Sequence, residues 1–166
     1  MSLRVGTDVS VYVETTVVSY LTARPSRDLI AAARQEATRE WWEAAQDAYA
    51  LVASELVIEE AAAGDKAAAE ARLAWLRGLP LLEITAPAAT LAQGLLDADA
   101  LPAEAPRDAL HIAVAAIHSV PYLATWNFRH IANVTKRVAI ARAIEDAGYD
   151  PPVIATPEDL LEVLRP

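Results

Sequence analysis

Hydrophobic residues follow two spacings along the chain, which predicts short buried strands separated by helices. A run rich in β-branched residues begins at Val9 and ends at the carboxylate of Glu14, without alternation of polar and apolar positions. Such a run is typical of a strand that is buried on both faces of a parallel sheet. Similar short runs predict further strands over 50–53, 81–85, 122–125 and 153–155.

Between these runs the apolar residues keep a helical spacing. A long helix is expected from an N-cap at Ser26 to about Ala48, with Trp41 and Trp42 in the core or at a dimer interface, because no basic cluster surrounds them. Ser54 is expected to cap the next helix. Further helices are predicted over 65–77, 87–97 and 134–147, and from 157 onward.

The segment 107–118 is apolar almost all round, so its helix is expected inside the domain. Alternating strands and helices predict an α/β fold with three α/β/α layers and a central, mainly parallel sheet of four or five strands. The length favours one domain over residues 1–166.

Composition narrows the class of protein. Hydrophobic residues make up 54% and charged residues 22%, which excludes a disordered chain, and the absence of cysteine excludes disulfides and thiolate metal sites. Neither a signal-peptide core nor a membrane-spanning run is present, so a soluble, cytoplasmic protein is expected. The net charge of -9 opposes sequence-blind binding of nucleic acid, which would need a local basic patch or a bound metal ion.

Four residues with side-chain oxygens are expected at one edge of the sheet. Glu14 follows the first strand, Glu60 lies on the helix after the second, Asp108 begins the apolar helix, and Asn127 follows the fourth strand. Ligands bind at the carboxyl ends of parallel strands, and oxygen donors suit Mg²⁺ or Mn²⁺. Each residue alone also has an ordinary explanation: a strand end, a solvated helix face, a charge that complements the helix dipole, and a turn.

Taken together, these segments resemble the PIN-domain family, and the chain looks like the VapC toxins of bacterial toxin–antitoxin pairs over nearly all of its length. The resemblance rests on four motifs in the family's order. The first is Val-Tyr-Val-Glu-Thr-Thr, which contains Glu14 and Thr16, and the second is the segment 54–60, which contains Glu60 and, as the weaker choice, Glu59. The third is Arg-Asp-Ala-Leu-His-Ile-Ala-Val-Ala, which contains Asp108. The fourth is Ala-Thr-Trp-Asn-Phe-Arg-His, which contains Asn127.

This resemblance implies a metal-dependent ribonuclease that hydrolyses RNA phosphodiester bonds, acting as the toxin of a toxin–antitoxin pair. Glu14, Glu60 and Asp108 would hold Mg²⁺ or Mn²⁺ directly or through water, while Thr16 and Asn127 would orient the water around the ion. A cognate antitoxin would cover the acidic site, and a homodimer is expected through apolar helix faces near the long helix. Three acids brought together without metal are expected to have raised pKa values.

Two positions depart from the family pattern. Glu14 stands where Asp is usual, and His130 stands where many members carry a last acid, so three carboxylates remain for one or two ions. His130 either contacts a phosphate of the RNA or has an ordinary role, packed against neighbouring residues or exposed to solvent. His111, three residues after Asp108, either supports that carboxylate or is a buried histidine with one hydrogen bond.

These departures leave a second function open, a catalytically degenerate PIN scaffold that acts as a protein-binding module. A receiver-type phosphoacceptor domain is disfavoured, because Glu14 has no acidic neighbour and 153–156 contains no lysine. The basic residues nearest to the site segments either guide the RNA backbone or are ordinary surface charges. They are Arg107, Arg129, Lys136 and Arg137.

Overall fold

The central sheet of the computed structural model, which describes residues 9–166, has five strands in the order β3-β2-β1-β4-β5. Every pairing is parallel, and Val13 of the central strand lies opposite Ala124. The strands are β1 (Ser10–Val13), β2 (Ala50–Ser54), β3 (Leu81–Leu82), β4 (Tyr122–Ala124) and β5 (Val153–Ala155). The predicted sheet is thus confirmed, with a third strand shorter than expected.

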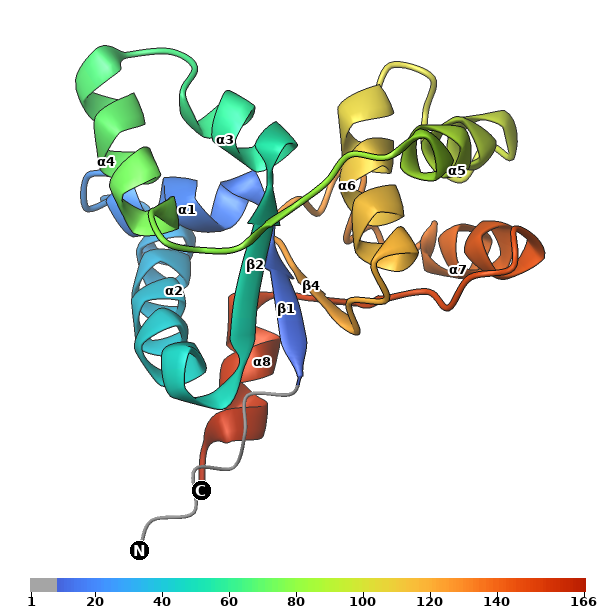
Figure 1. The fold of residues 1–166 in the computed structure, drawn as a ribbon. Coiled ribbons are helices and arrows are strands. Elements are labelled where there is room, and N and C mark those ends of the chain that lie inside the picture. The colour runs from blue at the N-terminus through green and yellow to red at the C-terminus, as the bar shows by residue number, and fades with distance from the viewer. Residues whose placement is uncertain (1–8) are drawn as a thin grey trace, which may run out of the picture.

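Helices cover both faces of the sheet and make the predicted three layers (Figure 1). In one layer α2 packs on α8 and α1 packs on α4, whereas in the other α5 packs on α6 and α7. The first layer holds α1 (Thr15–Thr22), α2 (Leu29–Ala48), α3 (Glu55–Ala61), α4 (Lys66–Leu76) and α8 (Pro157–Leu164). The second holds α5 (Ala86–Asp97), α6 (Pro106–Ile117) and α7 (Arg137–Asp146), which begins three residues later than its apolar pattern predicted.

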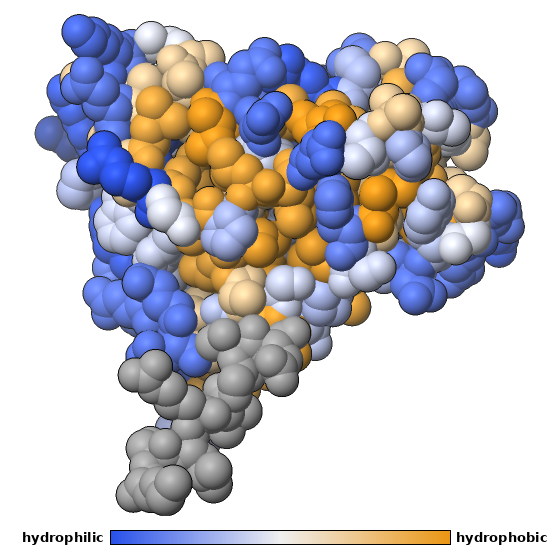
Figure 2. Space-filling model, in the orientation of Figure 1, coloured by the Kyte–Doolittle hydropathy of each residue, from blue (hydrophilic) through white to orange (hydrophobic). Residues whose placement is uncertain are grey.

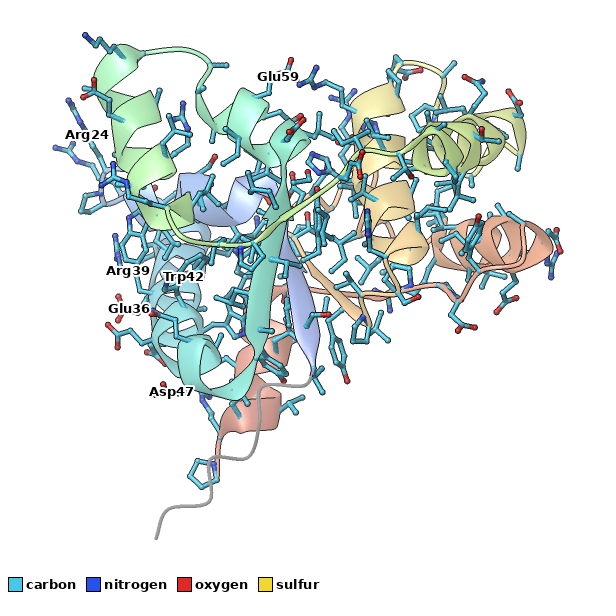
Figure 3. All side chains as sticks on the ribbon, viewed as in Figure 1. Arg24, Glu36, Arg39, Trp42, Asp47 and Glu59 are labelled. Atoms are coloured by element: carbon cyan, nitrogen blue, oxygen red, sulfur yellow. The ribbon has the colours of Figure 1, made fainter. Side chains whose placement is uncertain are left out.

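The core lies between the sheet and these helices. Helix α6 is buried from Ile112 to Ala116, as its apolar sequence predicts. Trp41 and Trp42 are also buried, which places them in the core. Figure 3 shows the charged side chains of Glu36, Arg39 and Asp47 on the outer side of the same helix. Helix α2 is therefore amphipathic.

The start of α2 differs from the prediction. Its N-cap is Asp28, whose Oδ1 accepts a hydrogen bond from Ala31 N at 2.8 Å, while Ser26 accepts one from Asp28 N at 3.1 Å. The helix therefore begins two residues later than a Ser26 cap implied. Its first apolar residues face solvent. Leu29 is 85% exposed and Ile30 is 65% exposed.

Hydrophobic residues also gather in the middle of the face shown in Figure 2, bordered by hydrophilic ones. Trp75 at the end of α4 and Leu81 on the edge strand β3 are among the exposed large hydrophobic residues. Within residues 9–166, no helix combines the length and apolar character needed to cross a bilayer.

The strand order creates a switch point in the topology of the sheet. From central β1 the chain moves outward to β2 and β3 and then returns to β4 on the opposite side of β1. Ligands of open parallel sheets bind beside the carboxyl ends of the strands where the order reverses. The carboxyl ends of β1 and β4, followed by Glu14 and Thr125, therefore mark the expected position of a site.

Candidate metal centre

Glu14 lies at this switch point with its side chain only 3% exposed. Its Oε2 accepts hydrogen bonds from Thr16 N at 3.1 Å, from the Thr16 hydroxyl, and from the Thr125 hydroxyl at 2.8 Å. Burial raises the pKa of Glu14, although nearby His111 and these hydrogen bonds oppose the shift. The prediction of a raised pKa therefore holds for this acid, and the protein keeps it in a poorly solvated position.

Glu60 reaches the same edge of the sheet from α3. Its Oε1 accepts a hydrogen bond from the Thr15 hydroxyl at 2.6 Å and lies 2.6 Å from His111 Nε2, while Oε2 accepts one from Arg107 Nε at 3.1 Å. Burial alone would raise the pKa of Glu60, but these bonds outweigh it and lower the pKa to about 2. The prediction of a raised pKa is wrong here, because donors the sequence did not indicate compensate the charge.

His111 is fully buried on α6 and links Glu60 to the core. Its Nδ1 lies 2.7 Å from the Tyr12 hydroxyl, which in turn lies 2.8 Å from Ser54 Oγ. The spacing that placed His111 beside Asp108 did not identify its partner. Asp108 lies a turn earlier, nearer the exposed end of α6, so the imidazole hydrogen-bonds Glu60 instead.

Asp108 pairs with the other histidine of this region. Its Oδ2 lies 2.6 Å from His130 Nδ1, and the two side chains are 21% and 18% exposed. Together with Glu60 and Arg107 they line a pocket of about 310 Å³ that also includes Glu104, Ala105 and Pro106. Asp108 thus lines the same pocket as Glu60.

Asn127 makes the turn that brings His130 to this position. Its Oδ1 accepts a hydrogen bond from His130 N at 3.0 Å, and its own backbone N donates to Thr125 Oγ1 at 3.0 Å. Neither bond involves a carboxylate of the site. The placement of Asn127 matches the turn explanation of this residue.

The loop after β4 is held by α1 and α2. Trp126 N donates to the Thr16 hydroxyl at 2.8 Å, and its indole Nε1 donates to the Thr38 hydroxyl at 2.9 Å. The guanidinium of Arg34 lies 5.5 Å from the Trp126 ring centroid, a cation–π contact. Thr38 lies in the middle of a helix, so no sequence signal pointed to it.

Three donor groups come close enough to hold one metal ion. One ligand atom from each of Glu14, Glu60 and His111 lies within 4.8 Å of the other two. Donors about 2.0–2.2 Å from a shared ion are at most about 4.4 Å apart, so this set fits an ion after a small adjustment. Of the three predicted metal-binding acids, the fold brings Glu14 and Glu60 together and leaves Asp108 outside the cluster.

The basic residues near the site are already engaged in part. Arg107 is half exposed and forms ion pairs with Glu60 and, at 3.2 Å, with Glu59. Figure 3 labels Glu59 beside α3. Lys136 Nζ donates to the backbone oxygen of Asp99 at 3.0 Å. Arg107 lines the pocket, as does His130.

Most of the chain matches the model of one protein family. Residues 11–136, more than half of the chain, match the family model of the PIN domain. The matched span runs from β1 to Lys136 and contains every residue of the site described above. A search of curated proteins finds no match to the chain.

Proposed function

This chain belongs to the PIN-domain family, and on that basis we propose that it is a metal-dependent endoribonuclease that hydrolyses RNA phosphodiester bonds. The observation that carries the proposal is the meeting of Glu14, Glu60 and His111 at the switch point of the sheet. A buried carboxylate with a raised pKa, such as Glu14, is costly to the fold, and strained groups of this kind concentrate at functional sites.

In this proposal Glu14 and Glu60 would hold Mg²⁺ or Mn²⁺, and Asp108, which lines the same pocket as Glu60, would hold it directly or through water. A bound ion supplies an activated water and offsets negative charge in the transition state. Thr16 fixes the carboxylate of Glu14, and Thr15 fixes that of Glu60. Asn127 acts indirectly, by holding the loop that carries His130.

Arg107 is proposed to contact the RNA phosphate. It is half exposed, lies in the pocket beside Glu60, and its guanidinium matches the geometry of phosphate oxygens. With a net charge of -9, the chain repels RNA on average, so this local contact and the ion must supply the attraction.

Cleavage of a mixed RNA pool tests this function. Metal-free protein is expected to be inactive in EDTA and to cleave when Mg²⁺ or Mn²⁺ is added. Glu60→Gln and Asp108→Asn should lower the rate roughly 100-fold or more, whereas Glu59→Gln, the exposed neighbour on α3, should leave it nearly unchanged. Undiminished cleavage by Glu60→Gln would contradict the proposal.

We further propose that the chain is a VapC-like toxin that acts on cytoplasmic RNA and is restrained by a small antitoxin. The pocket lined by Glu60, Glu104 and Asp108 suits a basic side chain of such a partner. Induced expression of the chain alone should arrest growth, and Asp108→Asn should not. Growth arrest by both the wild type and Asp108→Asn would show that toxicity does not depend on this site.

A homodimer is proposed through the start of α2. Leu29 and Ile30 present two adjacent apolar side chains to solvent there. The double substitution Leu29→Ser and Ile30→Ser should convert a dimer to a monomer in light scattering. A monomeric wild-type protein, or a dimer that survives this change, would contradict the proposed interface.

The second candidate function is a catalytically degenerate PIN scaffold that binds a partner protein. It is favoured by the pairing of Asp108 with His130, which keeps that acid out of the cluster. In this case the purified protein would bind no divalent ion and cleave no RNA. Asp108→Asn would then leave capture of the partner unchanged.

A further inference from the structure

We infer that His111 supplies a nitrogen ligand to the ion, so that this site holds a first-row transition ion such as Mn²⁺ in preference to Mg²⁺. The inference rests on the proposed metal-dependent function and deepens it, because it identifies the class of ion. It assigns His111 a role that the oxygen-only ligand set did not include.

The position of the imidazole is the first observation. His111 is fully buried, its Nε2 lies 2.6 Å from Glu60 Oε1, and one of its ring nitrogens lies within 4.8 Å of a Glu14 oxygen. A carboxylate has only acceptor atoms, so its close approach to a ring nitrogen requires a proton or a metal ion between them. The imidazole of His111 therefore lies beside the place where the two carboxylates meet.

The far side of the ring gives an independent observation. Metal-binding histidines usually donate their second N–H to an acceptor, which fixes the tautomer and the ring orientation. Here Nδ1 lies 2.7 Å from the hydroxyl of buried Tyr12, and that hydroxyl can donate onward to Ser54 Oγ, 2.8 Å away. With Nδ1 as donor, the free electron pair of the ring is on Nε2, the nitrogen that faces Glu60.

The third observation concerns the acid that the family resemblance implied. Asp108 is engaged by His130 and lies outside the cluster, so His111 takes the third place beside Glu14 and Glu60. An imidazole ligand suits Mn²⁺ and the later first-row ions, whereas Mg²⁺ binds oxygen donors in nearly ideal octahedral geometry. Replacing one oxygen by a nitrogen therefore shifts the preference of the site toward transition ions.

Pulsed electron paramagnetic resonance of the Mn²⁺-loaded protein tests this directly. Electron spin-echo modulation from a bound ¹⁴N is expected, and it should change to the ¹⁵N pattern when histidine alone is labelled. The chain has three histidines, so substitutions can assign the signal. His111→Gln should abolish the modulation. The control His118→Gln should keep it, because His118 Nε2 hydrogen-bonds the backbone of Glu83.

Calorimetry gives a second readout. Mn²⁺ should bind the wild-type protein roughly 10-fold or more tightly than Mg²⁺. His111→Gln should weaken Mn²⁺ binding roughly 10- to 100-fold and change Mg²⁺ binding much less. Tyr12→Phe, which keeps the ring and removes the acceptor of Nδ1, should weaken Mn²⁺ binding in the same direction. Equal losses of Mn²⁺ and Mg²⁺ affinity in His111→Gln would contradict a nitrogen ligand.

Bound Mn²⁺ without nitrogen modulation in the wild-type protein would overturn the inference, and this measurement needs no variant that must fold. His111 would then position Glu60 by a hydrogen bond alone. Modulation that survives His111→Gln would overturn it as well. RNA cleavage without nitrogen coupling would support the proposed nuclease function and contradict the histidine ligand. Nitrogen coupling without cleavage would support the histidine ligand and contradict the nuclease function. Failure to bind Mn²⁺ would remove both.

Discussion

Replacing the two converging glutamates by glutamine should change the stability of the metal-free protein in opposite directions. Glu14→Gln is expected to stabilise the fold at neutral pH, whereas Glu60→Gln is expected to destabilise it. Both substitutions remove a charge and nearly preserve the shape of the side chain. The opposite signs follow from the surroundings of each carboxylate.

The protein stabilises the charged carboxylate of Glu60 more than water does. Its pKa falls from 4.5 to about 2, because hydrogen bonds from His111, Thr15 and Arg107 outweigh the effect of burial. At about 1.4 kcal/mol per pKa unit, this difference stabilises the fold by roughly 3 kcal/mol at neutral pH. For a chain of this length, losing that energy lowers the Tm by roughly 6–12 °C.

The contribution of Glu60 depends on pH. A lowered pKa stabilises the fold above pH 4.5, and this stabilisation is lost as the pH falls toward about 2. The difference in stability between wild type and Glu60→Gln should shrink over that window.

Glu14 behaves in the opposite way, because burial raises its pKa. The stability that Glu14 contributes is complete below its ordinary pKa and is lost as the pH rises through the raised pKa of the folded state. At neutral pH this buried carboxyl group, whose pKa is raised, therefore costs stability, and the neutral glutamine of Glu14→Gln avoids that cost. This variant should be more stable than wild type and inactive, which is the usual trade-off at a functional site.

Thermal unfolding in EDTA, followed by circular dichroism at several pH values, measures both effects. Glu59→Gln is the matched control, because Glu59 is exposed and lies next to Glu60 on α3. A lower Tm for Glu14→Gln at neutral pH would refute the account of Glu14. A deficit of Glu60→Gln that stays constant down to pH 2 would refute that of Glu60.

Three further predictions concern the ion and the packing around the site. Mn²⁺ at 100 times its Kd should stabilise the wild-type protein by about 2.7 kcal/mol in thermal unfolding, and equal stabilisation of Glu60→Gln would argue against a site there. Thr38→Val leaves the indole N–H of Trp126 without its partner, so urea unfolding should show a loss of about 1–3 kcal/mol, and no loss would contradict the anchoring of the loop. Ile112→Ala opens a cavity at a fully buried position of α6 and should cost about 2–5 kcal/mol in the same assay; a cost below about 1 kcal/mol would place Ile112 outside the core.

The layers of the fold could be predicted because they depend on local patterns. Buried strands read as continuous apolar runs, and α6 read as a helix without a polar face. The cap at Ser54 was also recognisable from its type and position. The cap of α2 was not, because Ser26 and Asp28 are both good N-cap residues and only the backbone decides between them.

The composition of the site was predictable in part for the same reason. A residue that directly follows a parallel strand lies at the carboxyl edge of the sheet, so Glu14 could be placed there from the sequence. The rotation of each helix about its axis could not. That rotation joins Thr15 to Glu60 across 45 positions and Tyr12 to His111 across 99 positions. Periodicity predicts which residues share a face, but not which residue that face meets.

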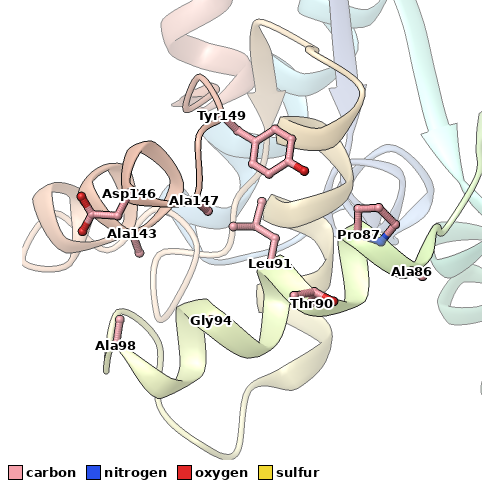
Figure 4. Close-up of a pocket in the computed structure, with 10 residues that line it drawn as sticks. All are labelled: Ala86, Pro87, Thr90, Leu91, Gly94, Ala98, Ala143, Asp146, Ala147 and Tyr149. Atoms are coloured by element: carbon pink, nitrogen blue, oxygen red, sulfur yellow. The ribbon is translucent and has the colours of Figure 1, made fainter.

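A pocket larger than the one beside Glu60 lies between α5 and α7. Its volume is about 740 Å³, and it is lined mostly by small and apolar residues together with Tyr149 and Asp146 (Figure 4). It lies in the second helix layer, and none of its lining residues belongs to the candidate metal centre.

The most direct test of the central claim is the chemistry of the RNA ends after cleavage with and without Mn²⁺. Attack by a metal-activated water leaves a linear phosphate on one new end and a hydroxyl on the other. We expect only such ends in mass spectra, only when the ion is present, and none from Glu60→Gln. Cleavage in EDTA, or ends that carry a 2′,3′-cyclic phosphate, would contradict metal-dependent hydrolysis at this site.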